Sequence, residues 1–85
     1  MSATASSQLD LLAAKMPRAN AAVAEAMIPG LWMTLSHIAD RTRPFYGGIR
    51  LSEGTVSTRI SANKKYGVTY TKRKITGGYE YKRLT

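Results

Sequence analysis

Apolar residues in the first third of the chain follow the spacing of a helix. Residues 19–28 are rich in alanine, the best helix former, and Val23 and Met27 stand four apart, which places them on one face. Proline cannot sit inside a continuous helix without losing a hydrogen bond, so Pro17 separates this helix from a possible shorter one at about residues 8–15. The pattern therefore predicts one amphipathic helix here, preceded by a tail.

A second helical pattern follows Thr34. Leu35, Ile38 and Ala39 fall at positions i, i+3 and i+4, so residues 35–42 predict a short amphipathic helix. The hydroxyl of Thr34 is suited to accept a hydrogen bond from a backbone N–H of the first turn. Residue 34 is therefore the expected N-cap of this helix.

A third helical pattern is carried by Val56 and Ile60, which stand four apart. Ser52 is the expected N-cap, and we expect the helix to run to about Lys65. Gly67 follows, and we expect it to end the helix by adopting a left-handed backbone conformation. The two aliphatic side chains should face the core and leave the opposite side of this helix exposed.

Beyond the third helix the period of the pattern changes to two. Residues 68–74 and 79–84 are rich in β-branched and aromatic side chains, and a turn at residues 76–78 joins them, so we expect a β-hairpin. The bulky residues 31–33 suit a brief additional strand. Helices combined with these strands predict an α+β fold with a three-helix core, a short strand and a C-terminal hairpin.

The length of the chain limits the number of domains. It has 85 residues, and cores below roughly 50 residues seldom hold without metals or disulfides, so we expect one folded domain. We place this domain at residues 19–85. Residues 1–18 are then an N-terminal tail with the possible short helix.

The sequence offers little material for catalysis. It contains no cysteine, one histidine and five acidic residues, which excludes thiolate nucleophiles, Cys-based zinc sites and His-rich metal clusters. We expect no enzyme activity, no cofactor and no small-molecule ligand. No apolar run reaches the roughly 18 residues of a membrane span, and no secretory leader is recognisable, so we expect a cytoplasmic protein without membrane contact.

The positive charge of the chain is concentrated in its C-terminal half. The formal net charge is +8, yet residues 1–40 hold two basic side chains against three acidic ones. Residues 41–85 hold eleven basic side chains against two acidic ones. A positive field of this kind attracts polyanions, which favours nucleic acid as the partner. The same charge also fits two alternatives, a surface that keeps the protein in solution and a patch that binds lipid headgroups.

Three segments resemble those of a known family. The segment TLSHIADRT at residues 34–42 and the segment SEGTVSTRI at residues 52–60 are similar to the second and third helices of winged helix-turn-helix DNA-binding domains. The closing GGYEYKRL at residues 77–84 resembles the second wing strand of small phage and prophage members. The resemblance covers about residues 19–85. The loop at residues 43–50 is longer than the tight turn of the simplest members.

The resemblance implies sequence-specific binding of double-stranded DNA by a small transcriptional regulator of phage or prophage type, associated with the nucleoid. The third helix would enter the major groove, where Arg59 can pair with guanine and the hydroxyl side chains can contact bases or phosphates. The hairpin would supply phosphate contacts. The expected DNA-binding residues are Ser52, Thr55, Ser57, Thr58, Arg59, Lys64, Lys65, Lys72, Arg73, Lys74, Lys82 and Arg83.

Structural roles also fit the same basic residues. Arg59 can lie along the core with its charge in solvent, and the cluster of Lys72, Arg73 and Lys74 can protect an exposed edge strand from pairing with other chains. Two other functions also fit the sequence. One is a winged-helix interaction module, such as a phage protein that docks on a host nucleoprotein. The other is an architectural protein that binds RNA or DNA without reading sequence.

The bulky residues outside the helices have expected structural roles. We expect Trp32 in the core, where it would pack the first helix onto the sheet. Alternate side chains of a strand face opposite sides, so one tyrosine of the hairpin should also cover the core. Tyr81, together with Leu84, is the expected cover.

A second copy of the chain is a possible partner. One DNA-binding module of this size buries only about 600–1,000 Å² on DNA, so useful affinity suggests a dimer or several adjacent copies. The N-terminal segment around Leu11, Leu12 and Met16 is the candidate surface for a homodimer.

Overall fold

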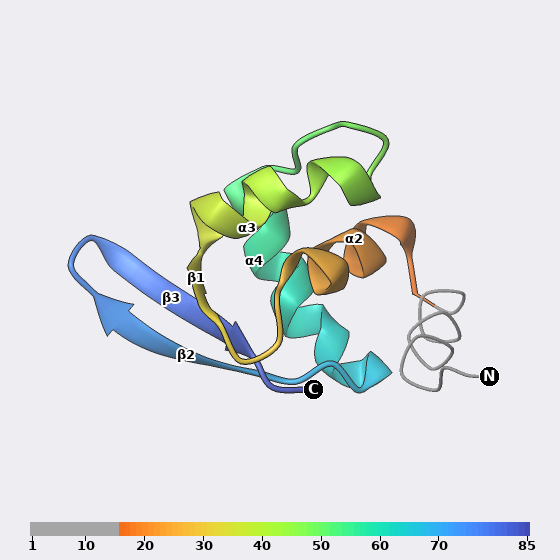
Figure 1. The fold of residues 1–85 in the computed structure, drawn as a ribbon. Coiled ribbons are helices and arrows are strands. Elements are labelled where there is room, and N and C mark those ends of the chain that lie inside the picture. Colours follow the sequence, from red (N-terminus) through yellow and green to blue (C-terminus); the bar gives the residue numbers. More distant parts are fainter. Residues whose placement is uncertain (1–15) are drawn as a thin grey trace.

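The computed structural model describes residues 16–85, which form three α-helices and a three-stranded antiparallel sheet (Figure 1). The expected α+β class with three helices is therefore confirmed, and the possible helix at residues 8–15 lies outside the described residues. The elements are α2 (Arg18–Ala26), β1 (Trp32–Thr34), α3 (Leu35–Arg41), a 3-10 turn (Arg43–Phe45), α4 (Glu53–Ala62), a second 3-10 turn (Asn63–Tyr66), β2 (Tyr70–Ile75) and β3 (Gly78–Arg83).

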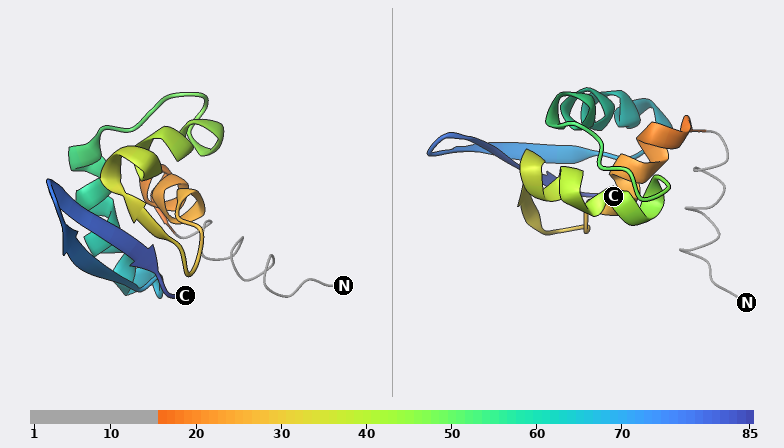
Figure 2. Two further views of the ribbon diagram at one scale, coloured as in Figure 1. Left: turned by 60° about the vertical axis from the view of Figure 1, so that its left-hand side comes forward. Right: turned by 90° about the horizontal axis from the view of Figure 1, so that it is seen from above.

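The sheet has β3 at its centre, in the order β1-β3-β2. β2 and β3 form the expected hairpin with its turn at residues 76–77, where Gly77 adopts a φ of 85° that glycine tolerates without strain. β1 pairs with residues 80–82 of β3 and then leads directly into α3. The tip of the hairpin therefore extends beyond β1 and beyond the helices (Figures 1 and 2).

The core lies between the helices and the face of the sheet that carries Met33 and Tyr81. Val56 and Ile60 of α4 are 0% and 2% exposed, so the expected inner face of this helix is confirmed. The other members of the main core are Val23, Ala26, Met27, Ile38 and Ala39.

The helix ends follow local signals in the sequence. The Thr34 hydroxyl accepts a hydrogen bond from the N–H of His37 at 3.1 Å, and the Ser52 hydroxyl accepts one from the N–H of Thr55 at 3.2 Å. Both expected N-caps are therefore confirmed. α4 ends at Ala62, earlier than expected, because the chain tightens into a 3-10 turn before it stops at Gly67, whose φ is 86°.

The long connection between α3 and α4 is closed by Thr42. Its buried hydroxyl donates to the carbonyl of Ala39 at 2.6 Å and accepts from the N–H of Leu51 at 3.0 Å. The two ends of the loop thus meet at one side chain. The extra length of the loop does not separate the two helices, because α3 and α4 remain in contact.

A buried pair of asparagines joins α2 to the end of α4. The Asn20 side-chain N–H donates to Oδ1 of Asn63 at 2.9 Å, and the Asn63 side-chain N–H donates to the carbonyl of Asn20 at 3.1 Å. Both residues are at most 2% exposed. Polar groups at this depth need such partners, so the pair fixes how the two helices align.

Two expectations about packing are wrong. Trp32 does not enter the core, because its neighbour Met33 takes the inner face of β1 and alternation places Trp32 on the outer face. Tyr81 is buried as expected, but Leu84 is 51% exposed because it follows the end of β3. Met16, one residue of the predicted homodimer surface, is 7% exposed and packs on Ala24 and Val68 of this chain, and the homodimer itself stays a prediction. Leu11 and Leu12 lie outside the described residues.

Candidate nucleic-acid interface

The side of α4 opposite Val56 and Ile60 is open to solvent. Thr58 and Ser61 are exposed there, and no other part of residues 16–85 covers them. Thr55 and Ser57 are half-buried at the flanks of the helix, and Ser52 is exposed at its N-cap. The structure thus leaves one side of this helix available to a ligand.

Basic residues of α4 and the turn that follows it differ in exposure. Lys64 and Lys65 are exposed in the 3-10 turn, and the ammonium of Lys65 lies 5.4 Å from the ring centre of Tyr66. Arg59 is half-buried, and its Nε is enclosed without a hydrogen-bond partner among the described residues. This nitrogen is therefore less accessible than the helical spacing alone indicates.

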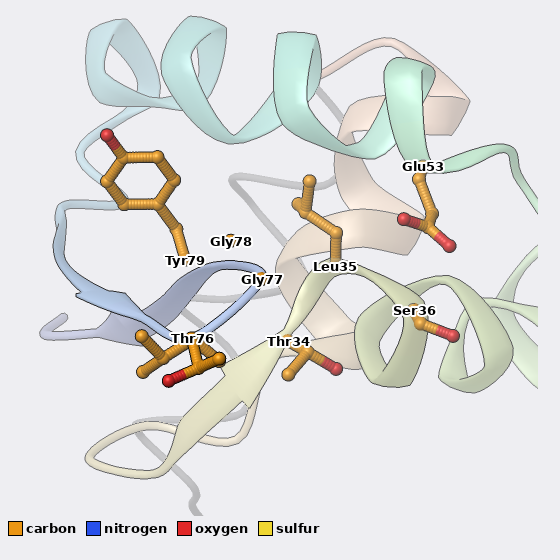
Figure 3. A pocket seen from close by; sticks show the side chains of 9 residues that line it. Thr34, Leu35, Ser36, Glu53, Thr76, Gly77, Gly78 and Tyr79 are labelled. Carbon is orange, nitrogen blue, oxygen red and sulfur yellow. The ribbon is translucent and has the colours of Figure 1, made fainter.

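The inner face of the hairpin carries two lysines. Residues that pair across antiparallel strands share a face, and Lys72 pairs with Tyr81, which is part of the core. Lys74 pairs with Tyr79 on the same face. The ammonium of Lys72 lies 4.8 Å from the ring centre of Tyr79, and this ring projects from the hairpin toward α4 (Figure 3). The two lysines are thus on the face of the sheet on which α4 packs.

The outer face of the hairpin carries a different cluster. Arg73 bonds the carboxylate of Glu80 at 2.8–2.9 Å, and its guanidinium lies 4.1 Å from the ring centre of Trp32. Lys82 lies 4.8 Å from the same ring. The expected cationic cluster of the hairpin is therefore divided, with Lys72 and Lys74 on one face and Arg73 and Lys82 on the other.

Arg83 is engaged inside the fold. Its Nη1 donates to the carbonyls of Ala24 at 2.9 Å and Met27 at 3.5 Å, at the C-terminal end of α2. Arg41 donates to the carbonyl of Ala26 at 2.9 Å at the same helix end. Burial lowers the pKa of the Arg83 guanidinium, which still stays charged at neutral pH. Cations at a helix C-terminus are favourable, so both arginines stabilise α2.

Arg50 organises the surface at the start of α4. It donates to the carboxylate of Asp40 and lies 3.8 Å from the carboxylate of Glu53. The hydrogen bond from Arg50 lowers the pKa of Asp40. The ion pair therefore stabilises the fold above pH 3.8, the ordinary pKa of this group, and is lost as the pH falls through the lower folded value.

A pocket of about 350 Å³ lies between the hairpin turn and the N-terminal ends of α3 and α4 (Figure 3). Its lining holds the carboxylate of Glu53 and no cationic side chain. A phosphate would therefore meet negative charge there. The pocket residues are Thr34, Leu35, Ser36, Glu53, Ile75, Thr76, Gly77, Gly78 and Tyr79.

Residues 16–85 hold no group of three or more His, Asp or Glu side chains that could bind a metal ion. None of the helices in this range has the length and apolarity that crossing a bilayer requires. Comparisons with known protein families, with curated proteins and with solved structures find no match for this chain.

Proposed function

We propose that the protein is a winged helix-turn-helix domain that binds double-stranded DNA and reads its sequence, as a small transcriptional regulator of phage or prophage type. In this proposal α4 enters the major groove and the β2–β3 hairpin is the wing. An α-helix fits the width of the major groove, and the uncovered side of α4 supports this placement. The order of helices and strands is compatible with the winged-helix arrangement.

One observation carries the proposal: Lys72 and Lys74 lie on the face of the sheet on which α4 packs. Together with Lys64 and Lys65 at the end of α4, they form a set of four exposed lysines with no ion pair among the described residues. Unpaired lysines beside an open helix suit the phosphates that flank a groove. We therefore assign phosphate contacts to these four lysines, and not to Arg73, Lys82 or Arg83.

The experiment that tests the proposal is selection of bound fragments from a random duplex pool, followed by an electrophoretic shift assay at two salt concentrations. Selected and scrambled duplexes of equal length serve as competitors. We expect the preference for the selected duplex to persist as salt rises, because base contacts do not release counterions. Equal weakening on every sequence would indicate an architectural protein. Negligible duplex affinity would favour the protein-docking alternative.

A further inference from the structure

The exposed side of α4 offers few of the groups that read guanine or adenine. Guanine is commonly read by Arg or Lys and adenine by Asn or Gln. The residues of α4 that are wholly or partly open and lie away from the core are Gly54, Thr55, Ser57, Thr58, Arg59, Ser61 and Ala62. Arg59 is the single long side chain among them, and its Nε is enclosed.

Each of the two threonines of α4 makes one local hydrogen bond with its hydroxyl. The Thr58 hydroxyl donates to the carbonyl of Gly54 at 3.0 Å, and the Thr55 hydroxyl accepts from the Ser52 hydroxyl at 2.9 Å. The Thr58 proton is thus bound within the helix, the Thr55 hydroxyl still holds its own proton, and each side chain also carries a methyl group. Ala62 adds a third methyl, and Thr55, Thr58 and Ala62 follow one another at i, i+3 and i+7 along one side of the helix.

We propose that α4 reads the 5-methyl groups of thymine through the methyl groups of Thr55, Thr58 and Ala62. Threonine and alanine methyls make apolar contacts with the thymine methyl in the major groove. The exposed lysines at the end of α4 and on the hairpin supply the affinity for phosphates, and the small side chains let the helix backbone approach the base edges. The ligand is then a duplex with A·T pairs opposite these three residues. The proposal rests on the proposed function, because it specifies what the same helix reads.

The test replaces thymine by uracil in the duplex that selection from a random pool yields. Uracil pairs as thymine does and lacks only the 5-methyl group. We expect the dissociation constant, measured by fluorescence anisotropy, to rise about fourfold for each contacted methyl that is removed, the equivalent of about 0.8 kcal/mol for one buried carbon. Uracil outside the contacted positions should leave the constant unchanged.

Two variants of Thr58 assign the effect to this side chain. Thr58→Ser keeps the hydroxyl and removes the methyl, whereas Thr58→Val keeps a methyl at the same place and removes the hydroxyl. Thr58→Val should retain the fourfold penalty for uracil at the contacted position. Thr58→Ser should lose most of this penalty, because one of the two methyl partners is already gone. Circular dichroism verifies that both variants are folded, as expected for an exposed residue.

The outcomes separate this proposal from the one on which it rests. Sequence preference that persists while fully uracil-substituted duplex binds as well as the thymine duplex would overturn methyl reading and leave the proposed function intact. An equal uracil penalty in Thr58→Ser and in the wild type would overturn the assignment to Thr58. Absence of any preference between selected and scrambled duplexes would overturn both proposals.

Discussion

Lys72 and Arg73 are neighbours in the sequence and lie on opposite faces of the hairpin. Lys72 shares its face with the buried Tyr81, whereas Arg73 bonds Glu80 and stacks on Trp32. The period of two along a strand is the physical cause. Charge that forms one cluster in the sequence is thus divided between an inner face for the proposed ligand and an outer face where it stabilises the hairpin.

Lys72→Ala and Lys82→Ala remove the same charge from opposite faces of one hairpin. We expect Lys72→Ala to weaken every duplex alike, on the order of tenfold at 0.1 M salt, because a phosphate contact carries no sequence information. Lys82→Ala is the matched control and should change the affinity far less. Fluorescence anisotropy with selected and scrambled duplexes measures both. Equal losses in the two variants would contradict the division of the hairpin into two faces.

Arg83→Ala separates a structural role from a DNA contact. The guanidinium binds the carbonyls of Ala24 and Met27, so its loss should lower the free energy of unfolding by about 2 kcal/mol. For a domain of this size that corresponds to a fall in Tm of roughly 8–16 °C, measured by thermal denaturation with circular dichroism. An unchanged Tm combined with weaker DNA binding would instead support the phosphate contact expected from the sequence.

At the scale of elements, the predictable features are those whose causes are local. The N-caps at Thr34 and Ser52 act over three residues, and the inner face of α4 follows from two side chains one turn apart. Features that depend on contacts between residues far apart in the sequence could not be predicted from it. The side of the sheet on which Trp32 lies depends on which residue of β1 packs into the core. Arg83 lies 59 residues from the carbonyl of Ala24 that it binds.

Part of the candidate interface could likewise be predicted from the sequence. The helical spacing of Val56 and Ile60 indicates which side of α4 is open, and the structure confirms that side as uncovered. The division of the hairpin cations was not deduced, although the alternation that causes it is visible in residues 70–75. The enclosure of the Arg59 Nε depends on how α4 packs against the rest of the fold, which no local pattern encodes.

The alignment of α2 with α4 should depend on the asparagine pair. Asn63→Ala leaves the buried amide of Asn20 without its acceptor, so we expect the free energy of unfolding to fall by about 2 kcal/mol, measured in urea. The double variant Asn20→Ala/Asn63→Ala should lose less than the sum of the two single changes, because it removes both members of one contact. Strict additivity would show that the two amides do not stabilise each other.

At the scale of the whole molecule, the net charge of +8 is not uniformly available to a polyanion. Arg50 and Arg73 are paired with carboxylates, and Arg41 and Arg83 bind carbonyls at the end of α2. The exposed lysines at the end of α4 and on the inner face of the hairpin have no such partner among the described residues. The effective charge toward DNA is therefore smaller than the formal one.

This difference predicts the salt dependence of binding. Each neutralised phosphate contributes about −0.9 to the slope of log K against log salt concentration, so the four lysines should give a slope of about −4 on duplex DNA. Titrations between 50 and 200 mM salt measure it, and the variant Lys72→Ala/Lys74→Ala should bring it to about −2. A slope near −7 would mean about eight phosphate contacts, twice the number that the four lysines supply, and would bring in basic residues such as those on the outer face of the hairpin. A slope near zero would mean that the lysines serve another partner, because no protein can neutralise phosphates without releasing their counterions.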